Sequence, residues 1–228
     1  MTSIRWVAVA VVVVLLSVEA LAETPFRYRE YALASSVATV IKISNTREDG
    51  VKTLHERPAL IQEFEWRAPY VSSGTELADP VRDILFGFFD DQLYQVVVTY
   101  DRDRMEGLTN DDVIESLSST YGVPLLRHSN VGRPAVAGNA AEESTVIAQW
   151  EDAESVVTLT RGTYSPQVRL VLSSKALNRR ARAAITEAIR LDAQDAPRRE
   201  RDQRNKEVAD ARVASQKTRV VNKAAFKP

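Results

Sequence analysis

Two long apolar segments joined by two aspartates constrain the fold of this chain more than any other feature of its sequence. VRDILFGFF, residues 81–89, is followed by Asp90-Asp91 and then by QLYQVVVTY, residues 92–100. Strand-forming residues on both sides of a short polar turn predict a β-hairpin. The apolar residues that alternation places on one face of each strand are Ile84, Phe86 and Phe88, then Tyr94, Val96, Val98 and Tyr100. We therefore expect an antiparallel sheet with one apolar face that packs on a helix.

A short helix and another strand are predicted before the hairpin. In SSVATVIKI, which begins at Ser35, the apolar residues fall on one helical face, and Ser35 or Ser36 can cap the first turn. A loop then leads to ALIQEFEWR, residues 59–67, in which apolar and polar residues alternate as in a strand.

A second helix is predicted near residues 110–121, because capping residues stand at both of its ends. Thr109 can serve as the N-cap with Asp112 three residues later, Gly122 is a left-handed terminator, and Pro124 follows. After an irregular loop at residues 127–143, three more strands are expected in STVIAQW, ESVVTLTR and QVRLVLSS.

The two halves share one order of elements, which suggests an internal duplication. Val37 in the first helix corresponds to Val113 in the second, and Trp66 corresponds to Trp150 at the end of a strand. An insertion in the 127–143 loop would explain the longer second half. The predicted fold class is α+β, with helices layered on an antiparallel sheet in a tandem helix-strand-strand-strand repeat, followed by a C-terminal helical arm.

The N-terminus has the pattern of an export signal. Arg5 precedes an apolar run from Trp6 to Val18, and Ala20-Leu21-Ala22 follows. The run is shorter than the roughly 20 residues that cross a bilayer as a helix, so we expect cleavage after Ala22, with an uncleaved anchor as the alternative. The mature protein is then expected to be periplasmic or secreted, without a transmembrane anchor.

Composition separates an acidic body from a basic arm. Residues 23–174 hold 14 Lys and Arg against 23 Asp and Glu, whereas residues 175–228 hold 15 against 7. We therefore divide the chain into a signal peptide (1–22), a tandem α+β body (23–174) and the arm (175–228). The same asymmetry also fits two solvated faces, or an arm that folds back on its own body. The sequence contains no cysteine, which excludes disulfides, thiolate chemistry and a lipid-bearing cysteine.

The arm begins with an amphipathic helix and continues as a charged tail. Its predicted apolar stripe consists of Leu177, Ala181, Ala184, Ile185, Ala188 and Ile189. Beyond Pro197 we expect a solvated or frayed helix, supported by Glu200 with Arg204 and Asp202 with Lys206. The candidate partner-binding residues are Arg198, Arg199, Arg201, Arg204 and Lys206. They suit an anionic envelope surface or an envelope protein, and export argues against nucleic acid; a solvated helix without a partner is the alternative.

Residue patterns of catalysis and metal binding are weak. His55 and His128 lack a second ligand at metal spacing, and Asp101 with Asp103 only partly resembles a calcium loop, so a solvated turn is the better interpretation. The acidic pairs Asp90-Asp91, Glu63 with Glu65, and Glu142-Glu143 are better explained as a turn, a strand face and a loop than as catalytic pairs. Trp66 and Trp150 are expected in the core. We therefore predict no catalytic, cofactor-binding or metal-binding residue.

The second half resembles the BamE/SmpA-like periplasmic module. The resemblance rests on Gly107-Leu108-Thr109, the helix around Val113, Gly122-Val123-Pro124 and the strand that ends near Trp150. It implies helices on a small antiparallel sheet and a non-enzymatic role in envelope assembly or protein binding. The chain departs from that family in lacking the lipid-bearing cysteine and in having the long basic tail.

Three functions follow from these features. The first is an exported, non-enzymatic binding or envelope-associated module. The second is a carboxylate-dependent envelope hydrolase, suggested only by the acidic pairs. The third is a structural adaptor that docks through its basic C-terminal arm.

Overall fold

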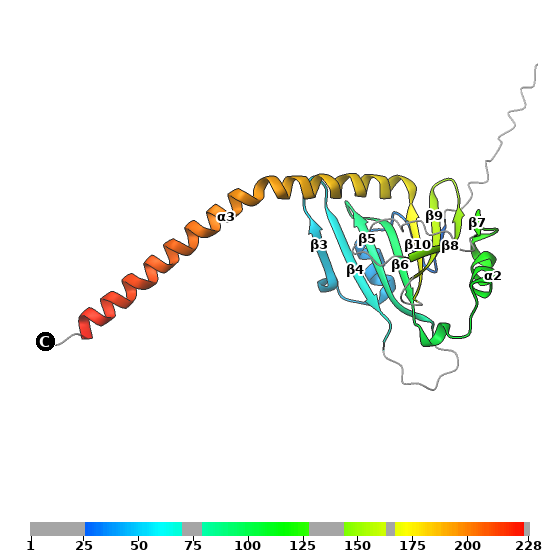
Figure 1. Ribbon diagram of the computed structural model, residues 1–228, viewed down its shortest axis with the longest axis horizontal. Helices are drawn as coiled ribbons and strands as arrows, with labels where there is room; N and C mark the ends of the chain where they lie inside the picture. Colours follow the sequence, from blue (N-terminus) through cyan, green and yellow to red (C-terminus); the bar gives the residue numbers. More distant parts are fainter. Residues whose placement is uncertain (1–25, 70–78, 128–143, 163–166, 226–228) are drawn as a thin grey trace, which may run out of the picture.

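The protein combines an antiparallel sheet with helices, and its computed structural model describes residues 26–69, 79–127, 144–162 and 167–225 (Figure 1). In chain order the strands are β1 (Arg27–Tyr28), β2 (Tyr31–Ala32), β3 (Val51–His55), β4 (Ile61–Arg67), β5 (Val81–Phe89), β6 (Gln92–Tyr100), β7 (Leu126–Arg127), β8 (Ser144–Glu151), β9 (Ser155–Gly162) and β10 (Val168–Ser174). The helices are α1 (Val37–Ser44), α2 (Asn110–Tyr121) and α3 (Lys175–Ala225), with short 3-10 turns at Glu48–Gly50 and Asp103–Met105. The predicted α+β class is confirmed.

The predicted hairpin is β5 and β6, and its turn also organises neighbouring elements. Asp90 and Asp91 both have left-handed backbones, with φ of 46° and 62°. The Asp90 carboxylate accepts a hydrogen bond from the Leu60 amide at 3.0 Å, and the Asp91 carboxylate accepts one from the Val37 amide at 2.9 Å. The two aspartates therefore form the turn and also fix the chain just before β4 and at the start of α1.

The large sheet has eight strands in the order β3-β4-β5-β6-β10-β9-β8-β7. Each half supplies a helix and four strands, whereas the sequence predicts a helix and three strands. The strands of this sheet that the sequence analysis did not predict are β3, none of whose residues is fully buried, and the two-residue β7; the separate two-stranded sheet of β1 and β2 was also not predicted. Trp66 lies in β4 and Trp150 in β8, strands that occupy equivalent places counted from the two edges of the sheet. Internal duplication itself remains a prediction.

One face of the sheet packs against α1 and α2. Ile84, Phe86 and Phe88 of β5 point into this main core and are almost fully buried. Val40 of α1 and Ile114 of α2 belong to the same core. The predicted face is buried in β5 and at Val96 and Val98 of β6. Tyr94, predicted on that face, lies on the other one, because the register shift between Gly87 and Phe88 puts Leu93 in the main core instead.

The other face of the sheet is covered at one end by the first part of α3. Phe89 of β5 points to the side opposite Phe88 and forms a second, smaller core with Ile61, Tyr94 and Ala181. The expectation of a single apolar face is therefore incomplete, because the final residue of the apolar run serves the second face.

The helix ends follow the capping chemistry of the sequence, with one correction. The Ser36 side chain accepts a hydrogen bond from the Thr39 amide, and Thr109 forms a reciprocal capping box with Asp112. Gly122 ends α2 with φ of 80° and ψ of −158°, an extended region open to glycine rather than the left-handed helical region predicted. The predicted signal peptide, Glu142-Glu143 and most of the 127–143 loop lie outside the described residues.

Candidate docking helix and its junction with the sheet

The first part of α3, residues 175–196, packs against the sheet. It follows β10 directly and is rich in alanine, the strongest helix former. Ala181 is fully buried and Ala188 nearly so, which lets the helix axis come close to the strands. The Arg180 guanidinium lies over the Phe89 ring at 4.8 Å from its centroid. The predicted stripe is wrong at its last member, because Ile189 is 59% exposed.

The second part of α3, residues 198–225, is the more basic portion of the 175–228 segment, and from here on the name arm is used for this second part alone. From Pro197 to Lys223 every side chain is exposed. Figure 1 shows this part leading away from the sheet, with no other described element beside it. The solvated or frayed helix that the sequence analysis expected beyond Pro197 is continuous through Ala225.

Pro197 separates the two parts of the helix. Proline lacks the amide hydrogen of a helical bond and crowds the preceding turn, which bends a helix. Figure 1 shows α3 changing direction between its sheet-packed part and the arm. Two arginines donate hydrogen bonds to backbone carbonyls in this region. Arg201 Nε donates to the carbonyl oxygen of Pro197 at 3.2 Å, and Arg199 Nη2 donates to the carbonyl oxygen of Asp192 at 2.9 Å.

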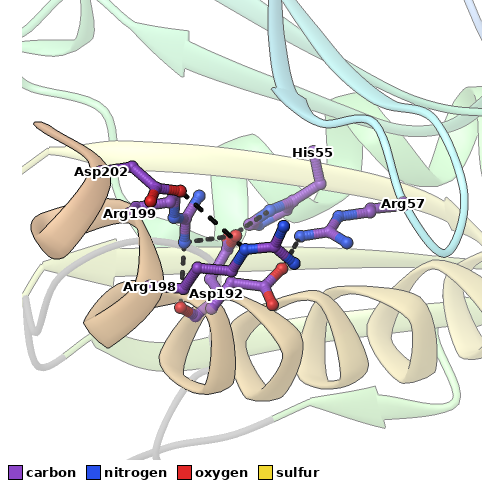
Figure 2. Close-up of polar contacts among 7 residues, drawn as sticks. His55, Arg57, Asp192, Arg198, Arg199 and Asp202 are labelled. Atoms are coloured by element: carbon purple, nitrogen blue, oxygen red, sulfur yellow. Dashed lines mark hydrogen bonds and ion pairs between the residues drawn. The ribbon is translucent and has the colours of Figure 1, made fainter. Parts of the chain in front are cut away.

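Polar residues next to Pro197 tie the helix to the end of β3, and this cluster is called the junction (Figure 2). His55 is the last residue of β3, and its Nδ1 lies 3.8 Å from an Asp192 oxygen. Arg57, two residues later, forms a hydrogen-bonded ion pair with Asp195. This hydrogen bond raises the pKa of Arg57 and holds the pKa of Asp195 below its usual value.

The helix side of the junction has its own ion pairs. Arg199 Nη2 lies 3.1 Å from an Asp192 carboxylate oxygen, and Arg198 Nε lies 3.9 Å from Asp202. Exposed pairs of this kind contribute about 1 kcal/mol or less each to stability. They therefore add little to the stability of the fold, and the Arg199–Asp192 pair joins residues on opposite sides of Pro197.

The predicted partner-binding residues fall into two groups. Arg198, Arg199 and Arg201 lie at the bend and contact groups of their own helix. Arg204 and Lys206 lie further along the arm, exposed and without an ion pair among the described residues. Asp202 contacts Arg198 rather than the expected Lys206.

Sequence reasoning missed the body side of the junction. Arg57 and Asp195 are 138 residues apart in the chain, and neither belongs to a periodic pattern. The available signal was opposite charge on the two segments, which does not select one pair from many.

The described acidic pairs have structural roles. Asp90 and Asp91 accept the backbone hydrogen bonds given above. Glu65 binds Arg67 at 2.9 Å on the exposed side of β4. Burial raises the pKa of Glu63, which lies on the same side of the strand.

The partial calcium pattern forms a turn. Asp101 Oδ1 accepts hydrogen bonds from the amides of Asp103 and Arg104 at 3.0 and 3.2 Å. Across the described ranges no group of three or more His, Asp or Glu side chains is placed to hold a metal ion. His55 belongs to the junction, and His128 lies outside those ranges.

The body has shallow cavities. One of about 240 Å³ is bordered by Trp66 and by Arg29, whose guanidinium binds Asp79 at 2.6 and 2.7 Å. Another of about 310 Å³ is lined by polar and charged side chains, among them Asp103 and Glu106. Both carboxylates are exposed, whereas a carboxyl group that acts as a general acid is commonly kept in an apolar pocket.

Trp150 is fully buried and donates a hydrogen bond from its indole nitrogen to the Gly122 oxygen at 2.9 Å. Trp66 is half-buried at the edge of the main core. The expected core positions of the two tryptophans agree with this placement.

Together these features define an α+β protein with a projecting basic helix. No protein-family model, curated protein or solved structure matches the chain. The resemblance to the BamE/SmpA-like module therefore stays a prediction. Within the described ranges, no helix is both long and apolar enough to cross a membrane.

Proposed function

We propose that the chain is an exported, non-enzymatic docking protein whose body holds a projecting helix for attachment to a partner surface. The observation that carries this proposal is α3, a 51-residue helix whose residues from Pro197 to Lys223 are all exposed. A helix that is polar on every side gains little from packing on its own body, and spanning solvent toward another component is one use of such a helix.

The junction supports the same function. His55 and Arg57 hold the helix just before the bend through Asp192 and Asp195, and Arg199, just after the bend, pairs with Asp192. These contacts favour one direction for the arm. Fixing a binding element in advance lowers the entropy lost when it binds.

The envelope is the proposed location, on the basis of the N-terminal charge, apolar and A-x-A pattern and the resemblance to the BamE/SmpA-like module. The adaptor hypothesis of the sequence analysis is therefore the form of binding module that we favour. No described acidic pair supports the hydrolase hypothesis with a second converging group in an enclosed site.

Co-sedimentation with isolated cell-envelope fractions tests the proposal. The mature full chain is compared with a chain ending at Asp202, which keeps the residues of the junction and removes most of the arm. We expect the full chain to pellet at low salt and the shortened chain to remain soluble, because the shortened chain lacks most of the arm's charges. Such exposed charges act over about 10 Å at 0.1 M salt. Equal pelleting of both chains, or of neither, would contradict a docking role for the arm.

A further inference from the structure

The last part of the arm carries positive charge without acidic residues nearby in the sequence. Between Asp210 and Ala225 there is no Asp or Glu. The basic residues of this segment are Arg212, Lys217, Arg219 and Lys223. All four are exposed, and their side chains form no ion pair with any residue of the described ranges.

Four cations of the arm fall on one face of the helix, and we call them the basic stripe: Arg201, Arg212, Arg219 and Lys223. Successive members are 11, 7 and 4 residues apart, spacings that bring a helix back to nearly the same side. The stripe extends over about 33 Å at 1.5 Å per residue.

The residues that share this face are uncharged. Asn205, Val208 and Ser215 lie between the members of the stripe. The arm's acidic residues lie on the remaining sides of the helix: Glu200, Asp202, Glu207 and Asp210. The arm therefore presents one long face that carries positive charges and uncharged residues but no acidic residue.

Stabilisation of the helix does not explain this arrangement. Cations favour the C-terminal end of a helix only within its last turn, which accounts for Lys223 but not for Arg212 or Arg219. Their position on one face, several turns from the end, indicates a ligand that extends along the helix.

The apolar content of the arm argues against a protein groove as that ligand. A helix that binds in a groove needs large apolar anchors at helical spacing. From Arg198 to Ala225 there is no aromatic residue, leucine or isoleucine, and the large apolar residues are four valines. Of these, Val213 and Val220 lie together on a side away from the stripe. A flat surface with distributed negative charge fits this face better.

We infer that the basic stripe lies along an anionic lipid surface, a step that rests on the proposed docking function. Each Lys or Arg held close to an anionic leaflet strengthens attachment by about fivefold. The scarcity of large apolar side chains restricts the arm to the headgroup level, without insertion into the hydrocarbon. The predicted export brings the mature chain to membranes and away from nucleic acid.

A matched pair of double variants of the full mature chain tests this inference. R212Q/K223Q removes two cations of the stripe that are 11 residues apart, and K206Q/K217Q removes two cations at the same separation on another side of the arm. Sedimentation is measured with vesicles of phosphatidylcholine alone and with vesicles that also contain phosphatidylglycerol. Circular dichroism checks that both variants keep the helix.

We expect the unaltered chain to bind only the vesicles with phosphatidylglycerol. R212Q/K223Q is expected to lose roughly 30-fold in affinity and K206Q/K217Q only a few-fold, because the control cations face away from the surface. Equal losses would overturn the assignment of the stripe. So would binding to duplex DNA as tight as binding to the anionic vesicles.

Failure of the lipid inference can be distinguished from failure of the docking function. If the full chain pellets with envelope fractions but not with the anionic vesicles, the partner is an envelope component other than the lipid surface and the lipid inference is overturned alone. If it binds neither, both proposals fail.

Discussion

The two parts of α3 both contain alanines but place them in opposite environments. Ala181 and Ala184 in the first part are buried against the sheet, whereas Ala211 and Ala214 in the arm are exposed. Alanine favours the helix equally in both parts. The difference comes from the apolar stripe of the first part, which packs on Phe89 of the second sheet face, whereas the arm contains neither leucine nor isoleucine. Helix propensity determines that α3 forms, and the sheet determines where it stops contributing to the core.

The largest expected effect comes from the sheet side of this contact. Phe89→Ala removes a ring that is 5% exposed and central to the second core, so we expect a loss of about 3–5 kcal/mol in the free energy of unfolding. Ending the chain at Asp202 is expected to change it by less than about 0.5 kcal/mol. Urea denaturation measures both. Comparable losses would show that the arm also belongs to the folded core.

The same substitution in the two parts of the helix sharpens the comparison. Ala181→Leu forces a larger side chain between the helix and the sheet and should cost about 1–3 kcal/mol. Ala211→Leu should be neutral, because the position is exposed and leucine is nearly as good a helix former. Thermal and urea unfolding would report the difference, and a cost at both positions would mean that the arm packs against something in solution.

A smaller effect is expected at the junction, where a substitution should change the direction of the arm more than the stability of the fold. Arg57→Gln removes an exposed ion pair and should cost less than about 1 kcal/mol, while the arm samples a wider range of directions. Because the chain has no cysteine, single cysteines introduced at Glu154 and Gln216 can carry spin labels for a distance measurement. The matched control is Arg82→Gln, since Arg82 is similarly exposed and pairs with Asp83 away from the arm. A distance distribution that broadens equally in the control would refute the role of the junction.

The smallest effect is a dependence of the arm's direction on acid. The Arg57 hydrogen bond lowers the pKa of Asp195, so the contact is present above the ordinary aspartate value of about 3.9 and is lost as the pH falls through the lowered value. With the same spin labels, the distribution should stay constant from neutral pH to about 5 and broaden only in stronger acid. Asp195→Asn should broaden it at every pH. A distribution that changes near neutral pH would assign control to another group.

The elements that could be predicted from the sequence are those whose structure depends on local chemistry. The β5–β6 hairpin, the α2 capping box and the sheet-packed part of α3 each depend on residues close together in the chain. Their patterns could therefore be interpreted without knowledge of the tertiary fold.

The features that could not be predicted from the sequence are those that contacts between distant residues determine. β3 has little apolar alternation and becomes a strand because β4 offers it an edge. Phe89 ends an apolar run whose use on a second face depends on α3. The Arg57–Asp195 pair joins segments that only the folded sheet brings together. For the candidate site, the sequence predicted the charge of the arm but not the residues that direct it.

The central pairing of β6 with β10 determines the order in which the chain can acquire its structure. Thr99 lies opposite Arg169, so the middle of the sheet closes only when nearly the whole body has left the ribosome. Pairing between distant segments is slow, and until then β6 presents an unpaired edge to other strands. Because α3 begins where β10 ends, completing the sheet also completes the surface on which α3 packs. The arm therefore acquires its direction last, and an incompletely folded chain has no positioned arm.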